Sequence, residues 1–133
     1  MKTLNHTVHF NAKPEDIYEY LMNARKFANI TGGKASNPGK ISGKFSYYDE
    51  YIQGSNVELS PGKKIVWKWT CADFPNNHTT TVTIIFKKKG DKQTELDFTQ
   101  DNIPDDFYDD IAVAWKEFYW EPIKDYIEYL MWK

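Results

Sequence analysis

Few residues in this sequence are spaced as a catalytic or metal site would require. Cys71 is the only cysteine, so the chain can form neither an internal disulfide nor a cysteine-rich metal site. His6, His9 and His78 form no His-Glu-x-x-His pair or other close ligand spacing, and we predict no metal site. Neither Cys71 nor any serine lies in a local motif that supplies a base and an orienting group. We therefore predict no nucleophilic catalysis and no cofactor.

Five aspartates gather where the last helix is expected to begin: Asp101, Asp105, Asp106, Asp109 and Asp110. Buried carboxylate pairs can perform acid–base catalysis. Acidic side chains are also favoured at the positive end of a helix dipole, and we interpret the cluster in that way. A calcium loop would require the spacing Asp-x-Asp-x-Asp-Gly, which the sequence lacks.

The glycine-rich and basic segments do not indicate phosphate or nucleic-acid binding. Gly32 and Gly33 lie in a predicted loop at 31–39, but no Gly-Lys-Ser/Thr follows at the distance of a phosphate-binding loop. The lysine runs at 63–64 and 87–89 lie beside turn residues, which is typical of solvated hairpin ends. Seventeen basic and nineteen acidic residues give a net charge of -2, whereas nucleic-acid binding normally rests on a basic surface.

Aromatic residues are the most unusual feature of the composition. Five Trp, nine Tyr and eight Phe make up 17% of the chain. Tyr and Trp bury a large area but carry a polar group that needs a partner. Such residues can fill a core, line a ligand pocket or anchor a protein interface, and composition alone leaves these three roles open.

The elements that must position these residues follow from periodicity. Alternation predicts a half-buried first strand with Leu4, His6, Val8 and Phe10 on its apolar side. Pro14, followed by two acids, predicts the start of a helix, and a second short helix is expected at 24–30. The following sequence predicts an antiparallel meander with one face exposed to solvent. Its strands are expected at 44–48, 50–59, 65–70, 79–88 and 94–100.

The last element is a long helix, expected at 105–131. At about 100° per residue, its apolar stripe contains Phe107, Ile111, Trp115, Phe118, Tyr119, Pro122, Tyr126 and Leu130. Pro122 removes an internal hydrogen bond and should bend the helix. Trp120 is predicted to project from the opposite, charged side between Lys116 and Lys124. An exposed Trp in that position would anchor a partner protein.

The length of 133 residues fits a single domain, 1–133. The N-terminus lacks the apolar stretch of a signal peptide, and no window approaches the roughly 20 apolar residues that span a bilayer. We therefore expect a soluble, cytoplasmic protein of the α+β class, in which an antiparallel sheet packs against the long last helix.

Five stretches of the sequence, in order, resemble a known family. They are SGKFS at 42–46, ELSPGKKIVWKW at 58–69, TVTI at 81–84, TEL at 94–96 with NIP at 102–104, and WKEFYWEPIK at 115–124. These stretches are similar to the C-terminal domain of the heat-shock protein 90 ATPase activator and its stand-alone relatives, within the START-like (SRPBCC) superfamily. The resemblance implies the helix-grip fold, a curved antiparallel sheet wrapped around a long C-terminal helix, with one or two short N-terminal helices. The chain departs from the family at a glycine-rich segment, which here is Tyr48-Asp49-Glu50-Tyr51.

The resemblance also implies a cavity between the sheet and the last helix. Its expected lining is aromatic and aliphatic: Tyr47, Trp67, Trp69, Val82, Ile84, Phe86, Leu96, Phe98, Trp115, Phe118 and Tyr119. The alternative is that these side chains pack into a solid core. With a cavity, the implied function is a non-enzymatic, monomeric domain that binds a small apolar or aromatic ligand. Two alternatives remain: a protein-interaction module that contacts a chaperone through Trp120, and a cyclase or dehydratase of the kind that START-like folds also host.

Overall fold

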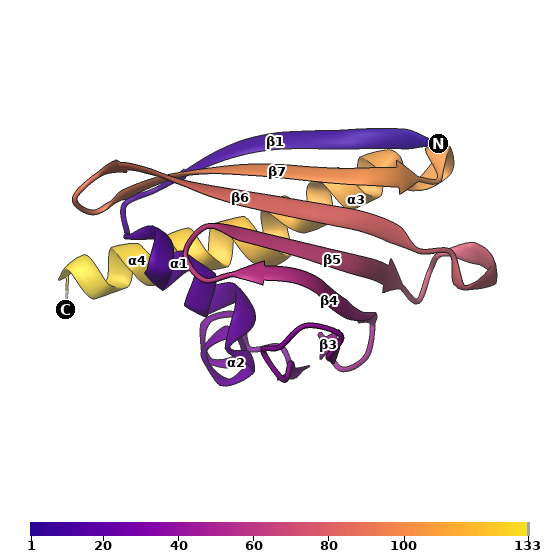
Figure 1. Cartoon of the computed structure of the whole chain (residues 1–133), viewed down its shortest axis with the longest axis horizontal. Coiled ribbons are helices and arrows are strands. Elements are labelled where there is room, and N and C mark those ends of the chain that lie inside the picture. The colour runs from indigo at the N-terminus through magenta and orange to yellow at the C-terminus, as the bar shows by residue number, and fades with distance from the viewer. Residues whose placement is uncertain (133) are drawn as a thin grey trace.

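The structure forms one seven-stranded antiparallel sheet, and the C-terminal helix crosses one face of it (Figure 1). It is a computed structural model that describes residues 1–132. The strand order is β1-β7-β6-β5-β4-β3-β2. The strands are β1 (Lys2–Phe10), β2 (Ala35–Ser36), β3 (Lys44–Tyr47), β4 (Ile52–Ser60), β5 (Lys64–Cys71), β6 (Thr80–Gly90) and β7 (Gln93–Ile103). The predicted α+β arrangement is confirmed.

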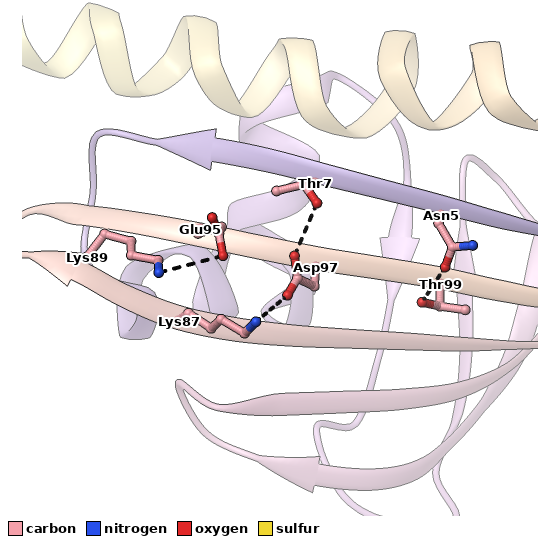
Figure 2. A network of polar contacts seen from close by, with 7 residues as sticks. All are labelled: Asn5, Thr7, Lys87, Lys89, Glu95, Asp97 and Thr99. Atoms are coloured by element: carbon pink, nitrogen blue, oxygen red, sulfur yellow. Dashed lines mark hydrogen bonds and ion pairs between the residues drawn. The ribbon is translucent and has the colours of Figure 1, made fainter.

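The two faces of the sheet differ as the alternation predicts. Every second side chain is buried in β5 from Ile65 and in β6 up to Phe86, as for Trp67 and Ile84. Figure 2 shows polar side chains that pair across β1, β7 and β6 on the solvent-facing side. Asp97 accepts a hydrogen bond from Thr7 at 3.2 Å and lies 2.7 Å from Lys87, which lowers the pKa of the Asp97 carboxyl. Figure 2 also shows Lys89 paired with Glu95 and Thr99 paired with Asn5.

Two short helices connect β1 to β2, namely α1 (Pro14–Met22) and α2 (Ala24–Thr31). Pro14 opens α1, as predicted, and the Asn23 side chain caps α2 by accepting a backbone hydrogen bond at 3.1 Å. Gly32 ends α2 with a left-handed φ of 78°. A side chain at Gly33 would come within 2.4 Å of the Tyr48 ring. Both glycines therefore have structural roles.

The predicted helix at 105–131 is present but has four segments: η2 (Asp105–Phe107), α3 (Tyr108–Trp115), the π-helical turn η3 (Lys116–Trp120) and α4 (Glu121–Trp132). At the π-helical turn, the Glu121 N–H donates to the carbonyl of Lys116, five residues earlier. Pro122 follows at once and has no N–H for the carbonyl of Phe118, its partner in a regular α-helix. The irregularity that Pro122 predicts is therefore a wider turn just before it. None of the helices within residues 1–132 is both long and apolar enough to cross a membrane.

The segment between β3 and β4 has an unusual backbone. Tyr48, Asp49 and Glu50 have left-handed φ values of 56°, 55° and 70°. Non-glycine residues adopt this conformation only at a cost of about 1 kcal/mol or more each. Because of this turn, β4 begins at Ile52 rather than at the predicted residue 50.

Candidate functional site

Aromatic rings fill most of the space between the sheet and the C-terminal helix. The Trp115 ring lies at the centre, with centroid distances of 4.1 Å to Tyr119, 4.5 Å to Phe98, 5.5 Å to Trp120 and 5.6 Å to Trp69. All five side chains are buried. These distances are typical of stacked and tilted rings in direct contact, so the centre of the molecule is a packed core.

A chain of hydrogen bonds fixes the Trp115 ring against the sheet. Its indole N–H donates to Gln100 Oε1 at 2.7 Å, and Gln100 Nε2 donates to Thr80 Oγ1 at 2.9 Å. The Thr80 hydroxyl in turn donates to the carbonyl of Trp69 at 3.0 Å. Gln100 and Thr80 are both buried, so each partner replaces the water that these groups would otherwise need.

A second, partly buried chain of hydrogen bonds joins the sheet to α1. The Trp67 indole N–H donates to Asn56 Oδ1 at 2.8 Å, and the Asn56 amide donates to Asn37 Oδ1 at 2.9 Å. The Asn37 amide donates to the Tyr47 hydroxyl at 2.9 Å, and that hydroxyl donates to the carbonyl of Leu21 at 2.6 Å. Burial raises the pKa of Tyr47 well above its usual value, so the hydroxyl keeps its proton and its role as a donor.

A small cavity of about 80 Å³ remains at one end of the aromatic core. It lies between α3 and η3 on one side and the segments that border β4 and β5 on the other. Six aromatic side chains line it: Tyr51, Trp69, Phe107, Trp115, Phe118 and Tyr119. Its polar lining comes from Cys71, Asp73 and Asp110.

The polar groups at this cavity are not arranged for nucleophilic attack. The Tyr51 hydroxyl donates to Asp73 Oδ2, and this hydrogen bond raises the pKa of Tyr51 far above its usual value. Burial raises the pKa of the Cys71 thiol, which therefore stays protonated near neutral pH. Asp73 and Asp110 are both exposed at the rim.

Two buried polar groups beside the cavity lack hydrogen-bond partners among residues 1–132. They are the Tyr119 hydroxyl and the Trp69 indole N–H. The two groups are neighbours but do not reach hydrogen-bond geometry with one another. Buried polar groups are nearly always paired, so these two groups are exceptions, as is the Trp120 indole N–H elsewhere in the core.

The predicted lining residues separate into two groups. Trp69, Trp115, Phe118 and Tyr119 line the cavity. The other seven are buried in the surrounding core: Tyr47, Trp67, Val82, Ile84, Phe86, Leu96 and Phe98. Phe118 is 45% exposed, although the apolar stripe predicts that it is buried.

The expectation that Trp120 is an exposed anchor is wrong. Trp120 is only 3% exposed and packs against Phe10, Phe98 and Trp115. The prediction assumed regular α-helical spacing, but the π-helical turn fits one extra residue and rotates the following side chains. That rotation brings Trp120 inward and leaves Phe118 at the surface.

The chemistry-bearing residues outside the cavity have structural surroundings. His78 Nε2 lies 2.7 Å from the carbonyl of Asn102, and His6 packs beside Phe98. Asp105 pairs with the N-terminal amine at 3.1 Å, and Asp109 and Asp110 lie in the first turn of α3, as the helix-start interpretation predicts. Within the part of the chain that the structure describes, no group of three or more His, Cys, Asp and Glu residues could hold a metal ion.

A wider groove of about 690 Å³ runs along β1, the edge strand of the sheet, beside the C-terminal helix. Its lining includes Val8, Val113, Lys116, Trp120 and Lys124. Val113 is 52% exposed, so the groove presents apolar as well as charged surface. Sequence patterns gave no signal for this groove because it depends on where the helix crosses the sheet.

Sequence analysis also missed the contact that joins the left-handed turn to the helix. The Tyr48 hydroxyl donates to the carbonyl of Phe118, the group that Pro122 leaves without its helical donor. We expect Tyr48→Phe to lower the free energy of unfolding by about 0.5–1.5 kcal/mol, because this bond is lost. Urea denaturation followed by circular dichroism measures the change. Tyr129→Phe, at a 59% exposed position, is the control, and equal midpoints for both variants would contradict the prediction.

Comparisons with known sequences identify the family to which this chain is similar. A sequence model of the family described as "Activator of Hsp90 ATPase homolog 1-like protein" matches residues 11–128. A relative from Dictyostelium discoideum, named "Activator of 90 kDa heat shock protein ATPase homolog", is 33% identical over 128 residues, which are 96% of this chain and 33% of that protein. The chain spans about a third of the length of the curated relatives it matches.

Comparisons with solved structures show the fold. An Hsp90 activator from Plasmodium falciparum has a TM-score of 0.88 at 24% identity, covering 96% of this chain and 97% of that chain. A protein described as the Aha1 dimer from Colwellia psychrerythraea has a TM-score of 0.81 at 21% identity, with coverage of 96% and 97%. The helix-grip fold that the sequence resemblance implies is confirmed.

Proposed function

Because the chain belongs to the Activator of Hsp90 ATPase homolog 1-like family, we propose that it is a non-catalytic module that binds an Hsp90-type chaperone and stimulates its ATPase activity. The observation that carries the proposal is the 33% identity to a named activator over 96% of this chain. The description of the family names an activator of an ATPase rather than a catalyst. Since the chain spans 33% of that relative, the proposal concerns the contribution of this part alone.

The filled interior supports a function at the surface. Pockets for drug-sized ligands usually measure roughly 300–1,000 Å³, whereas the cavity here has about 80 Å³. A bulky apolar ligand would have to displace the rings around Trp115. The alternative of a cyclase or dehydratase rests on fold analogy alone, and the carboxylates at the cavity, Asp73 and Asp110, are exposed.

The groove along β1 is the surface that best fits a protein partner. β1 lies at the edge of the sheet with nine residues, whereas the other edge strand, β2, has only two. A long edge strand has unpaired backbone groups that an extended segment of another protein can bind. Val113 adds exposed apolar surface beside it, and the charged groups are Lys124 and the Lys116–Glu121 pair, whose atoms lie 3.8 Å apart.

Adding this chain to a purified Hsp90 is expected to raise the inhibitor-sensitive rate of ATP hydrolysis in a saturable manner. Phosphate release measured across a range of chain concentrations tests this. Lys116→Glu, at the groove, is expected to require a higher concentration for half-maximal stimulation. Lys92→Glu, in the turn between β6 and β7, is the matched control and should behave as the parent chain. Trp120→Ala is unsuitable because Trp120 is buried, so its loss would change stability as well as binding.

A second measurement separates binding from stimulation. Backbone amide signals of the labelled chain should broaden or shift when Hsp90 is added, first among residues at the groove. If neither the signals nor the rate of ATP hydrolysis change, the proposal is wrong. A signal change without stimulation would restrict the role of this part to docking.

The oligomeric state and the cellular location stay predictions. The sequence predicts a cytoplasmic monomer, whereas the Colwellia psychrerythraea protein is described as a dimer. Light scattering coupled to size-exclusion chromatography measures the mass in solution directly. Chain concentrations in the ATPase titration should be expressed per monomer or per dimer, according to the mass found in that measurement.

A further inference from the structure

The cavity at the end of the aromatic core has the size of a small head group. One bound water needs roughly 10–15 Å³ of such space. An apolar cavity of roughly 150 Å³ holds benzene with its six heavy atoms, so the cavity of about 80 Å³ has room for about three to four heavy atoms. A lipid chain or a fused ring system does not fit beside the rings as they are packed. A trimethylammonium or a similar compact group does.

The walls of the cavity suit a cation. Tyr51, Phe107 and Phe118 surround its outer part, and Trp69 and Trp115 lie deeper, where they are almost fully buried. The face of an aromatic ring carries partial negative charge and attracts ammonium groups, most strongly when the cation is desolvated. These five rings come from the turn before β4, from β5 and from the first three segments of the C-terminal helix, so the fold gathers them from distant parts of the chain.

The negative charges at the rim of the cavity also favour a cation. Asp73 and Asp110 line the cavity, and no lysine, arginine or histidine among residues 1–132 does so. Asp73 is held by the Tyr51 hydroxyl, and Asp110 takes part in none of the ion pairs that the structure shows. Two carboxylates near a low-dielectric wall favour a cation and disfavour an anion.

The Tyr119 hydroxyl supplies an independent observation. The Tyr119 side chain is 1% exposed and lines the cavity. Its hydroxyl lies beside the Trp69 indole N–H, but neither group completes a hydrogen bond within the described part of the chain. A tyrosine hydroxyl has acceptor lone pairs as well as a proton. It can therefore accept from an ammonium N–H or pair with a water that enters with the ligand.

From the size, the aromatic walls and the acidic rim together, we propose that this cavity binds the alkylammonium group of a small organic cation. The rings hold the alkylated head, and Asp73 and Asp110 neutralise its charge at the mouth. The proposal concerns a site in the interior and does not depend on binding to a chaperone. The groove along β1 plays no part in it.

Choline and its uncharged carbon isostere, 3,3-dimethylbutan-1-ol, test the proposal because they share a shape and differ in charge. The side-chain indole N–H signals of the labelled chain are followed while choline chloride replaces sodium chloride at constant ionic strength. We expect a saturable shift of the Trp69 and Trp115 signals with a Kd in the millimolar range. Binding of the alcohol should be weaker by at least about tenfold. No shift with choline, or equal binding of the alcohol, overturns the proposal.

The variant Asp110→Asn removes one rim charge without changing the size of the side chain. We expect it to weaken choline binding several-fold, while its thermal unfolding stays close to that of the parent because Asp110 is exposed. Asp106→Asn is the matched control, since Asp106 is exposed, precedes the same helix and is not among the lining residues. Equal choline affinity in the two variants would show that the rim carboxylate has no role and would overturn the proposal.

Discussion

Replacing Trp115 with alanine is expected to lower the free energy of unfolding by about 3–5 kcal/mol. The indole is 1% exposed and packs against the rings of Tyr119, Phe98 and Trp69, so its removal leaves a large void in the core. It also leaves Gln100 Oε1 without its hydrogen-bond donor, the Trp115 indole nitrogen, which lies 2.7 Å away. Denaturation in guanidinium chloride, followed by far-ultraviolet circular dichroism, measures the loss.

Two variants separate the void from the lost hydrogen bond. Trp115→Phe keeps most of the ring but leaves Gln100 Oε1 unpaired, which should cost about 1–3 kcal/mol. Val113→Ala, two residues earlier on the same helix at a 52% exposed position, should change stability by no more than about 0.5 kcal/mol. If Trp115→Ala were no more harmful than Val113→Ala, the aromatic core described above would not be what holds the helix to the sheet.

The strands could be predicted because alternation reports burial directly. Trp67 and Trp69 lie two residues apart on β5 and share the buried face, while Lys68 between them is exposed. The same pattern holds for Val82, Ile84 and their neighbours on β6. One buried face fixes the register of each strand, so local sequence contains most of the information about the sheet.

The orientation of the last helix could be predicted only up to Lys116. Before that residue, Ile111 and Trp115 are buried as the apolar stripe requires. Beyond it, the π-helical turn exchanges the expected positions of Phe118 and Trp120. Pro122 was the available signal, because a proline deprives the carbonyl four residues earlier of its donor, and a helix can respond by widening as well as by bending.

The cavity could not be sized from the sequence. Its volume is what remains after the rings of Trp69, Trp115 and Tyr119 have packed, and that depends on side-chain rotation rather than on which residues are aromatic. Burial of the polar residues Gln100 and Asn56 was also not predicted. Gln100 does follow Leu96 and Phe98 at a spacing of two on β7, so its position indicates the buried face, but its residue type favours the exposed one.

A packed helix-grip interior changes which parts of this fold can carry function. A helix-grip protein with a wide chamber can hold its ligand inside, but here stacked rings and two hydrogen-bond chains occupy that space. Recognition of a large partner must then use the outer surface, where β1 has a free edge along a groove. The small remaining cavity is separate from that surface, so the two proposals can be tested with different variants.

Asn56→Ala is the second substitution expected to have a large effect, with a loss of about 2–4 kcal/mol in the free energy of unfolding. Asn56 is 1% exposed and accepts the Trp67 N–H at 2.8 Å, while its amide donates to Asn37 and to the carbonyl of Lys40. Alanine would leave the Trp67 N–H buried without a partner, and that unpaired group accounts for much of the expected loss.

A double-mutant cycle with Trp67→Phe isolates this contribution. Trp67→Phe alone removes the N–H and leaves Asn56 Oδ1 unpaired, whereas the double variant removes both polar groups of the bond observed at 2.8 Å. The two losses should therefore be less than additive, by about 1–2 kcal/mol, in equilibrium urea unfolding. Strict additivity would mean that Asn56 stabilises the fold through Asn37 and Lys40 alone. The hydrogen bond between Trp67 on β5 and Asn56 would then contribute nothing to the link between the sheet and α1.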